Sequence, residues 1–116
     1  MKTTLKLEEL AQFIFGIFLF SQLDYAWWWF LVLILAPDIG MLGYVINNKI
    51  GAISYNIFHH KGLALIILIV GMYQQVPAVE LIGIILFSHS AMDRMLGYGL
   101  KYADSFQNTH LGKVGK

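Results

Sequence analysis

The stretch LIGIILFSHSAMDRM (residues 81–95) decides the fold class, because an apolar run continues directly into His89, Asp93 and Arg94. The apolar segment around this stretch extends over residues 78–97, which is close to the ~20 residues that cross a ~30 Å hydrocarbon core. Such a segment predicts a transmembrane helix that carries ionisable groups near one end. Three more segments of this kind span residues 7–23, 26–47 and 51–73.

Composition places the chain in the membrane class. Hydrophobic residues make up 58% of its 116 residues and charged residues only 13%, whereas a soluble domain has about 25% charged residues. The formal net charge of +1 argues against a nucleic-acid partner, which would require a basic patch. No cysteine is present, which excludes disulfides and thiolate metal ligands. We therefore expect an integral membrane protein of the cell membrane, in contact with the lipid bilayer.

Short connections between the four segments predict an up-down-up-down bundle. The linkers QLDY, NNKI and QQVP leave room only for antiparallel hairpins. Lysines flank one side of the predicted spans, so the positive-inside rule places both termini in the cytoplasm. The prediction is thus an all-α, multi-pass four-helix membrane bundle forming a single domain over residues 1–116, with an ordered C-terminal tail over 98–116. Glycines spread through the spans suit close helix packing, and with it a homo-oligomer or a larger membrane complex.

Ionisable side chains inside the predicted spans indicate a site, because each costs several kcal/mol in hydrocarbon unless it is paired or lines a cavity. At ~1.5 Å per residue from the cytoplasmic helix ends, Asp38, His59 and His89 all lie roughly 12–14 Å deep. His89 and Asp93 are one turn apart and share a helix face. Pro37, just before Asp38, predicts a kink. We expect three helices to contribute to one interior polar site.

Carboxylate and imidazole groups at one depth are suitable ligands for Zn²⁺, Mn²⁺ or Fe²⁺. The candidate metal ligands are Asp38, His59, His60, His89 and Asp93. His59 and His60 differ by about 100° around a helix, and the sequence leaves open which of them faces the site. Asp93 is also a candidate catalytic residue, since it either ligates the metal or orients His89. The alternative is a structural network in which these groups satisfy one another and fix helix register.

Further polar residues near the predicted cytoplasmic mouth are candidates for contact with a substrate. Arg94 and Lys101 are candidate phosphate-binding residues. His110, in the tail, is a candidate catalytic residue that would reach the mouth of the bundle. Lys61 either extends to the interface or meets a phosphate or carboxylate in a wet cavity.

Four motifs together resemble a known family. They are APDIGMLGY (36–44), GAISYNIFHH (51–60), HSAMDRMLGYGLKY (89–102) and THLGKVG (109–115). Over nearly the whole chain these motifs resemble the small integral membrane proteins of domain-of-unknown-function family 4260, which implies a four-helix membrane architecture without an established activity. The chain is also distantly similar to membrane-bound metal-dependent hydrolases. Their Pro-Asp and His-Arg-Gly-x-Thr-His elements are similar to Pro37-Asp38 and His60-Lys61-Gly62, although the second Thr-His pair is missing here.

Three functions are compatible with these observations. The first is a metal-dependent hydrolase that acts on a lipid-like or phosphate-bearing substrate. The second is a non-enzymatic accessory subunit or small carrier of a membrane complex. The third is a haem electron-transfer module with His59 and His89 as axial ligands.

Overall fold

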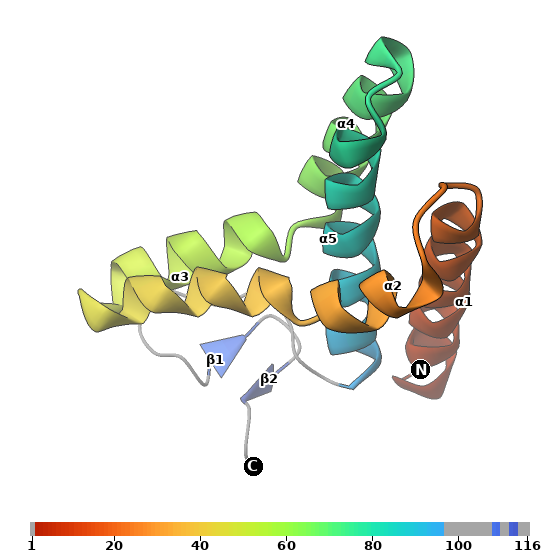
Figure 1. Cartoon of the computed structure of the whole chain (residues 1–116). Helices are drawn as coiled ribbons and strands as arrows, with labels where there is room; N and C mark the ends of the chain where they lie inside the picture. Colours follow the sequence, from red (N-terminus) through yellow and green to blue (C-terminus); the bar gives the residue numbers. More distant parts are fainter. Residues whose placement is uncertain (1, 97–107, 110–111, 114–116) are drawn as a thin grey trace.

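The computed structural model describes residues 2–96, 108–109 and 112–113 (Figure 1). The helices are α1 (Lys2–Ser21), α2 (Trp27–Leu33), the 3₁₀ helix η1 (Ala36–Val45), α3 (Asn48–Phe58), α4 (Lys61–Gln74) and α5 (Pro77–Met95). Two residues of β1 (Asn108–Thr109) pair antiparallel with two of β2 (Gly112–Lys113). The all-α prediction is confirmed for residues 2–96. Of the predicted tail, only this pairing lies within the described residues.

Helix α5 is the centre of the arrangement. It packs against α4 on one side and α1 on the other, while η1 and α3 pack mainly against each other. Figure 1 shows α1, α4 and α5 with their axes roughly parallel, and the η1–α3 hairpin projecting to one side of them. The junctions where this hairpin leaves the three-helix body therefore lie beside α5.

The predicted helix over residues 26–47 changes type part-way: α2 ends at Leu33, and the 3₁₀ helix η1 begins at Ala36. Pro37 is compatible with this break, because it has no N–H to donate to the preceding turn and its ring clashes with a continuing α-helix. The chain continues as η1 with Pro37 in its first turn, where a missing N–H leaves no bond unmade. Trp27–Val45 as a whole keeps the length and hydropathy of one membrane span.

The predicted helix over residues 51–73 is also interrupted, because α3 and α4 meet at His59 and His60 with a bend of 44°. His60 has an extended backbone, and its Nδ1 accepts a hydrogen bond of 3.1 Å from the Leu63 N–H. It thereby caps the start of α4, whose first N–H groups have no partner inside the helix. The four continuous helices of the predicted bundle are thus replaced by two unbroken helices and two broken ones.

Close backbone contacts hold α5 between its neighbours. A Cβ on Gly83 would lie 2.6 Å from the Leu68 backbone nitrogen of α4, and one on Gly16 of α1 would meet the Ser88 side chain. Small residues at such crossings let helices approach closely without a hydrophobic driving force between them. The buried apolar cluster lies among these helices and α2; it contains Phe20, Phe30, Ile34, Leu68, Ile84 and Ile85.

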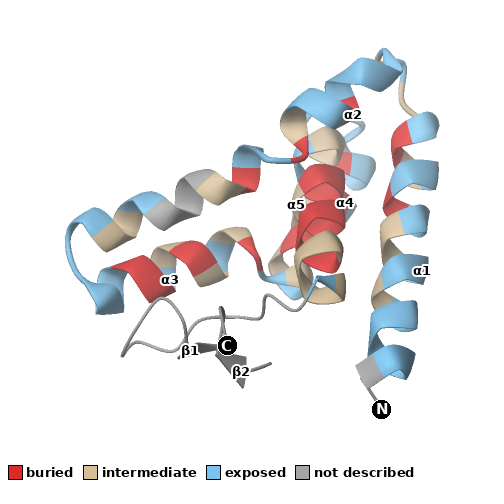
Figure 2. Cartoon of the chain, turned by 90° about the horizontal axis from the view of Figure 1, so that it is seen from below, coloured by how far each residue is buried: buried red, intermediate tan, exposed pale blue. Residues whose placement is uncertain are grey.

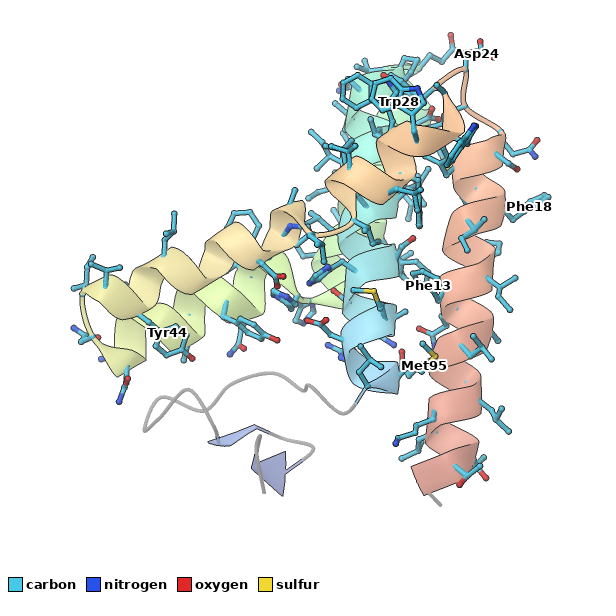
Figure 3. All side chains as sticks on the ribbon, turned by 60° about the horizontal axis from the view of Figure 1, so that its bottom comes forward. Phe13, Phe18, Asp24, Trp28, Tyr44 and Met95 are labelled. Atoms are coloured by element: carbon cyan, nitrogen blue, oxygen red, sulfur yellow. The ribbon has the colours of Figure 1, made fainter. Side chains whose placement is uncertain are left out.

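Polar groups lie inside the molecule and apolar groups cover much of its outside. His59, Ser88, His89 and Ser90 are at most 3% exposed. By contrast, large apolar side chains are exposed along every helix (Figure 2), and the Phe18 ring points away from the molecule (Figure 3). Among the described residues, Trp27–Val45 is long and apolar enough to cross a membrane, and α3 with α4 is a second such stretch if the bend lies within one span. These one or two candidate spans suggest a membrane protein.

Candidate metal centre

Four side chains from three parts of the chain meet beside α5. Asp38 comes from the first turn of η1, His59 from the break between α3 and α4, and His89 and Asp93 from successive turns of α5. One ligand atom of each residue lies within 4.8 Å of the other three. Asp38 and His59, each close to a helix break, therefore lie beside His89 and Asp93 of α5.

The distances within this cluster suit a small cation. His59 Nε2 lies 3.0 Å from His89 Nε2, 3.1 Å from Asp93 Oδ2 and 3.5 Å from Asp38 Oδ1. His89 Nε2 lies 3.1 Å from the Asp38 oxygen and 3.2 Å from the Asp93 oxygen. A tetrahedral ion with bonds of 2.0–2.1 Å has ligand atoms about 3.3–3.4 Å apart. These five separations are close to the edges of a tetrahedral N₂O₂ site, and the sixth, between the two carboxylate oxygens, is within 4.8 Å.

Backbone carbonyls set the orientation of both imidazole rings. His59 Nδ1 donates to the Tyr55 carbonyl at 2.8 Å, and His89 Nδ1 donates to the Ile34 carbonyl. A carbonyl can only accept, so each Nδ1 carries a hydrogen, and in the neutral ring the Nε2 lone pair faces the cluster. This is the usual second-shell arrangement of a metal-binding histidine. Two Nε2 atoms and two carboxylate oxygens then converge on one point, and either a metal ion between them or a proton carried on one Nε2 would satisfy this arrangement.

The first helix break supplies one of these carbonyls. In a continuous helix the Ile34 carbonyl would accept from an N–H three or four residues later. Pro37 has no N–H, and the Asp38 N–H donates to the Leu35 carbonyl instead, at 3.1 Å. The Ile34 carbonyl is thereby left available for His89.

Asp93 contacts both histidines of the cluster. Its Oδ2 faces the Nε2 atoms of His59 and His89, the ring atoms that point into the cluster, and not their Nδ1 atoms, which the backbone carbonyls hold. Tyr55 supports it, because the tyrosine hydroxyl donates to Asp93 Oδ2 at 3.3 Å. The Tyr55 ring also stacks on the His59 ring, with centroids 3.8 Å apart and planes at 7°. Tyr55 was not identified from the sequence; the available signal was its position one helical turn before His59.

Access to the cluster is one-sided. The side chains of His89 and His59 are 1% and 4% exposed, that of Asp93 is 13% exposed, and that of Asp38 is 45% exposed. Water or a ligand would therefore approach on the side of Asp38.

Other predicted residues lie around this cluster or beyond the described residues. His60 is exposed and caps α4, so the structure separates it from the neighbouring His59. Arg94 Nη2 donates to the His59 carbonyl at 3.1 Å and so holds the second break in place. Lys101 and His110, predicted as substrate-binding and catalytic, fall outside the described residues.

Lys61 meets a carboxylate rather than extending to an interface. Its Nζ lies 2.6 Å from Glu9 Oε2, 2.8 Å from Glu9 Oε1 and 2.6 Å from Gln12 Oε1. The side chains of Lys61 and Glu9 are each 16% exposed. This pair joins the start of α4 to α1, directly after the break that carries His59.

The geometry argues against the haem alternative. Two axial nitrogens stand about 4 Å apart across an iron, with the porphyrin plane between them. The two Nε2 atoms are only 3.0 Å apart and share their contacts with two carboxylates. In this arrangement no porphyrin fits between the rings.

Comparison with protein families supports the resemblance seen in the motifs. The sequence profile of a domain of unknown function, DUF4260, matches residues 2–114. The chain belongs to the DUF4260 family. No curated protein and no solved structure matches it. Membership of DUF4260 carries no assigned activity, so a functional proposal has to rest on the cluster itself.

The comparisons do not show the likeness to membrane-bound metal-dependent hydrolases. Of the two sequence elements that suggested it, the chain brings only one to the cluster. The Pro37-Asp38 element supplies a carboxylate. The histidine of the His60-Lys61-Gly62 element caps α4, and the cluster contains the residue before it instead.

Proposed function

We propose that this protein is a multi-pass protein of the cell membrane that holds a divalent metal ion, Zn²⁺ or Mn²⁺, and hydrolyses a lipid-like or phosphate-bearing substrate with it. The ligands are Asp38, His59, His89 and Asp93. A single observation carries the proposal: two imidazole Nε2 atoms 3.0 Å apart converge with two carboxylate oxygens. A metal ion would neutralise the two carboxylates and accept both Nε2 lone pairs, whereas the structural alternative needs a proton on one imidazole to do so.

A membrane location is supported by the candidate spans and by the many large hydrophobic residues that are exposed on the outside. The buried cluster and the exposed aliphatic side chains suit a chain whose outer solvent is hydrocarbon. Both termini would face the cytoplasm, as the lysines favour.

The donor set suits both proposed metals. Imidazole nitrogen is a preferred Zn²⁺ ligand, and carboxylate oxygen is shared by Zn²⁺ and Mn²⁺. Such an ion would supply Lewis acidity and an activated water. The chain's own residues would do the rest: the Tyr55 and Ile34 carbonyls hold the imidazole rings, and the half-exposed Asp38 leaves an approach for substrate. Arg94 and Lys101 would bind the phosphate of such a substrate, and His110 of the tail would act as a catalytic acid.

A second candidate, a small carrier or an accessory subunit of a membrane complex, is favoured by the two helix breaks. Interrupted helices that meet at a polar site are characteristic of ion-binding sites in transporters. A carrier would move a divalent ion across vesicle membranes, whereas the enzyme would retain it. Uptake of Mn²⁺ into vesicles that contain the protein distinguishes the two.

The experiment that tests the proposed function is elemental analysis of detergent-purified, tag-free protein. We expect near-stoichiometric zinc or manganese in the wild type and its loss in both Asp38→Ala and His89→Ala. Far-UV circular dichroism checks that the variants remain helical. Wild-type protein that is folded and free of metal, even after incubation with Zn²⁺ or Mn²⁺, would refute the proposal.

A further inference from the structure

An apolar groove is lined by residues that lie next to those of the cluster along the chain. It has a volume of about 190 Å³, and its lining is entirely apolar. The lining comes from the same elements as the cluster: the α2–η1 junction, the end of α3 and one side of α5. It consists of Leu33, Ala36, Pro37, Phe58, Leu81, Ile82, Ile85 and Leu86.

Sequence neighbours connect the groove to the cluster at three points. Pro37 precedes Asp38, and Phe58 precedes His59. On α5, Ile85 lies one turn before His89, about 6 Å along the helix axis. An extended molecule along this face of α5 would therefore have one end among aliphatic side chains and the other at the cluster.

We infer that this groove binds the hydrocarbon chain of a single-chain amphiphile whose polar head reaches the metal site. This inference rests on the proposed function and specifies its substrate class. A lining without a polar group offers nothing to a sugar, a base or a peptide backbone, but it accommodates an alkyl chain. Ile82, at the groove, is 52% exposed, so a chain can enter sideways from the surrounding lipid.

The groove volume sets a limit on the chain length it accepts. A cavity of about 150 Å³ holds the six carbons of benzene, so 190 Å³ holds about eight carbons. Affinity is expressed relative to hydroxamate dissolved in the bilayer, so each methylene that enters the groove adds only a packing gain, because it leaves lipid rather than water. The gain should stop near eight carbons, because further methylenes would lie outside the groove.

The test measures binding of n-alkyl hydroxamates, from two to twelve carbons, to Co²⁺-loaded protein in phospholipid nanodiscs. Hydroxamate is a metal-chelating head, and the visible absorption of Co²⁺ reports binding without any enzymatic activity. Two variants change the groove in opposite directions. Ala36→Leu adds three carbons to the lining and should lower the limit by about three carbons, while Ile82→Ala removes three and should raise it by about three.

Each outcome has a defined meaning. Opposite shifts of the limit, with unchanged affinity for the two-carbon hydroxamate, support the inference, because general damage would not move the limit in both directions. If the two-carbon probe binds but the three proteins show the same chain-length dependence, the groove is not the chain site and the proposed function stands. If no Co²⁺ binds, the proposed function fails and this inference fails with it.

Discussion

Replacing each of the two adjacent histidines by asparagine tests the cluster most directly. His59→Asn removes a ring nitrogen that lies 3.0–3.5 Å from the other three ligand atoms. His60→Asn is the matched control, because asparagine is also a good N-cap and keeps an acceptor for the Leu63 N–H. Both variants make the same chemical change at neighbouring positions.

The expected loss of metal affinity in His59→Asn follows from the proposed role of His59 as a ligand. Loss of an outer-shell partner weakens metal binding 10–100-fold, so loss of the ligand itself should weaken it by at least about 100-fold. At a free metal concentration of 100 times the wild-type Kd, the metal stabilises the wild type by about 2.7 kcal/mol. At the same concentration the His59→Asn variant would gain only about 0.4 kcal/mol. For a chain of this size the difference corresponds to about 10 °C in Tm.

The assay is a competitive titration of tag-free protein with a chelator that buffers Zn²⁺, together with thermal unfolding with and without the metal. We expect His60→Asn to stay within about two-fold of the wild-type affinity and about 0.5 kcal/mol of its stability. Equal losses in both variants, or a loss in His60→Asn alone, would refute the assignment of His59 to the cluster.

Three further outcomes are expected. Tyr55→Phe keeps the ring stacked but removes the hydroxyl that donates to the cluster, so metal affinity should fall about ten-fold in the same titration. Gly83→Ala places a methyl 2.6 Å from a backbone nitrogen of α4, and chemical unfolding should show a loss of about 1–3 kcal/mol. Lys61→Met and Glu9→Gln should each destabilise by about 2 kcal/mol, between the values for exposed and buried pairs; a double-mutant cycle in which the two losses simply add would contradict their pairing.

Local sequence patterns predict part of this architecture. Apolar runs of membrane length predict helices, and the helical repeat places His89 and Asp93 on one face whatever the rest of the chain does. Pro37 also gives a local signal, because a residue without an N–H kinks or interrupts a helix at the turn before it. The family motifs also depend only on residue order, and the match over residues 2–114 agrees with them.

The second helix break has no comparable signal. Nothing between Phe58 and Lys61 excludes a helix, and a single helix over 51–73 is the natural prediction. The break depends on contacts that form only in three dimensions: Arg94 holds the His59 carbonyl, and Lys61 reaches Glu9 on α1. The choice between His59 and His60 follows from that break, as does the stacking of Tyr55 on His59.

The helical class, the apolar segments and the shared face of His89 and Asp93 can be predicted from the sequence alone, because each depends on neighbours within one or two helical turns. The tertiary structure was needed to show that the η1–α3 hairpin projects from α1, α4 and α5, that His59 rather than His60 joins Asp38, and that the Ile34 carbonyl holds the His89 ring. The physical reason is distance along the chain. Asp38 and His59 are 21 positions apart, and Ile34 and His89 are 55 positions apart; helical periodicity carries no information across such separations.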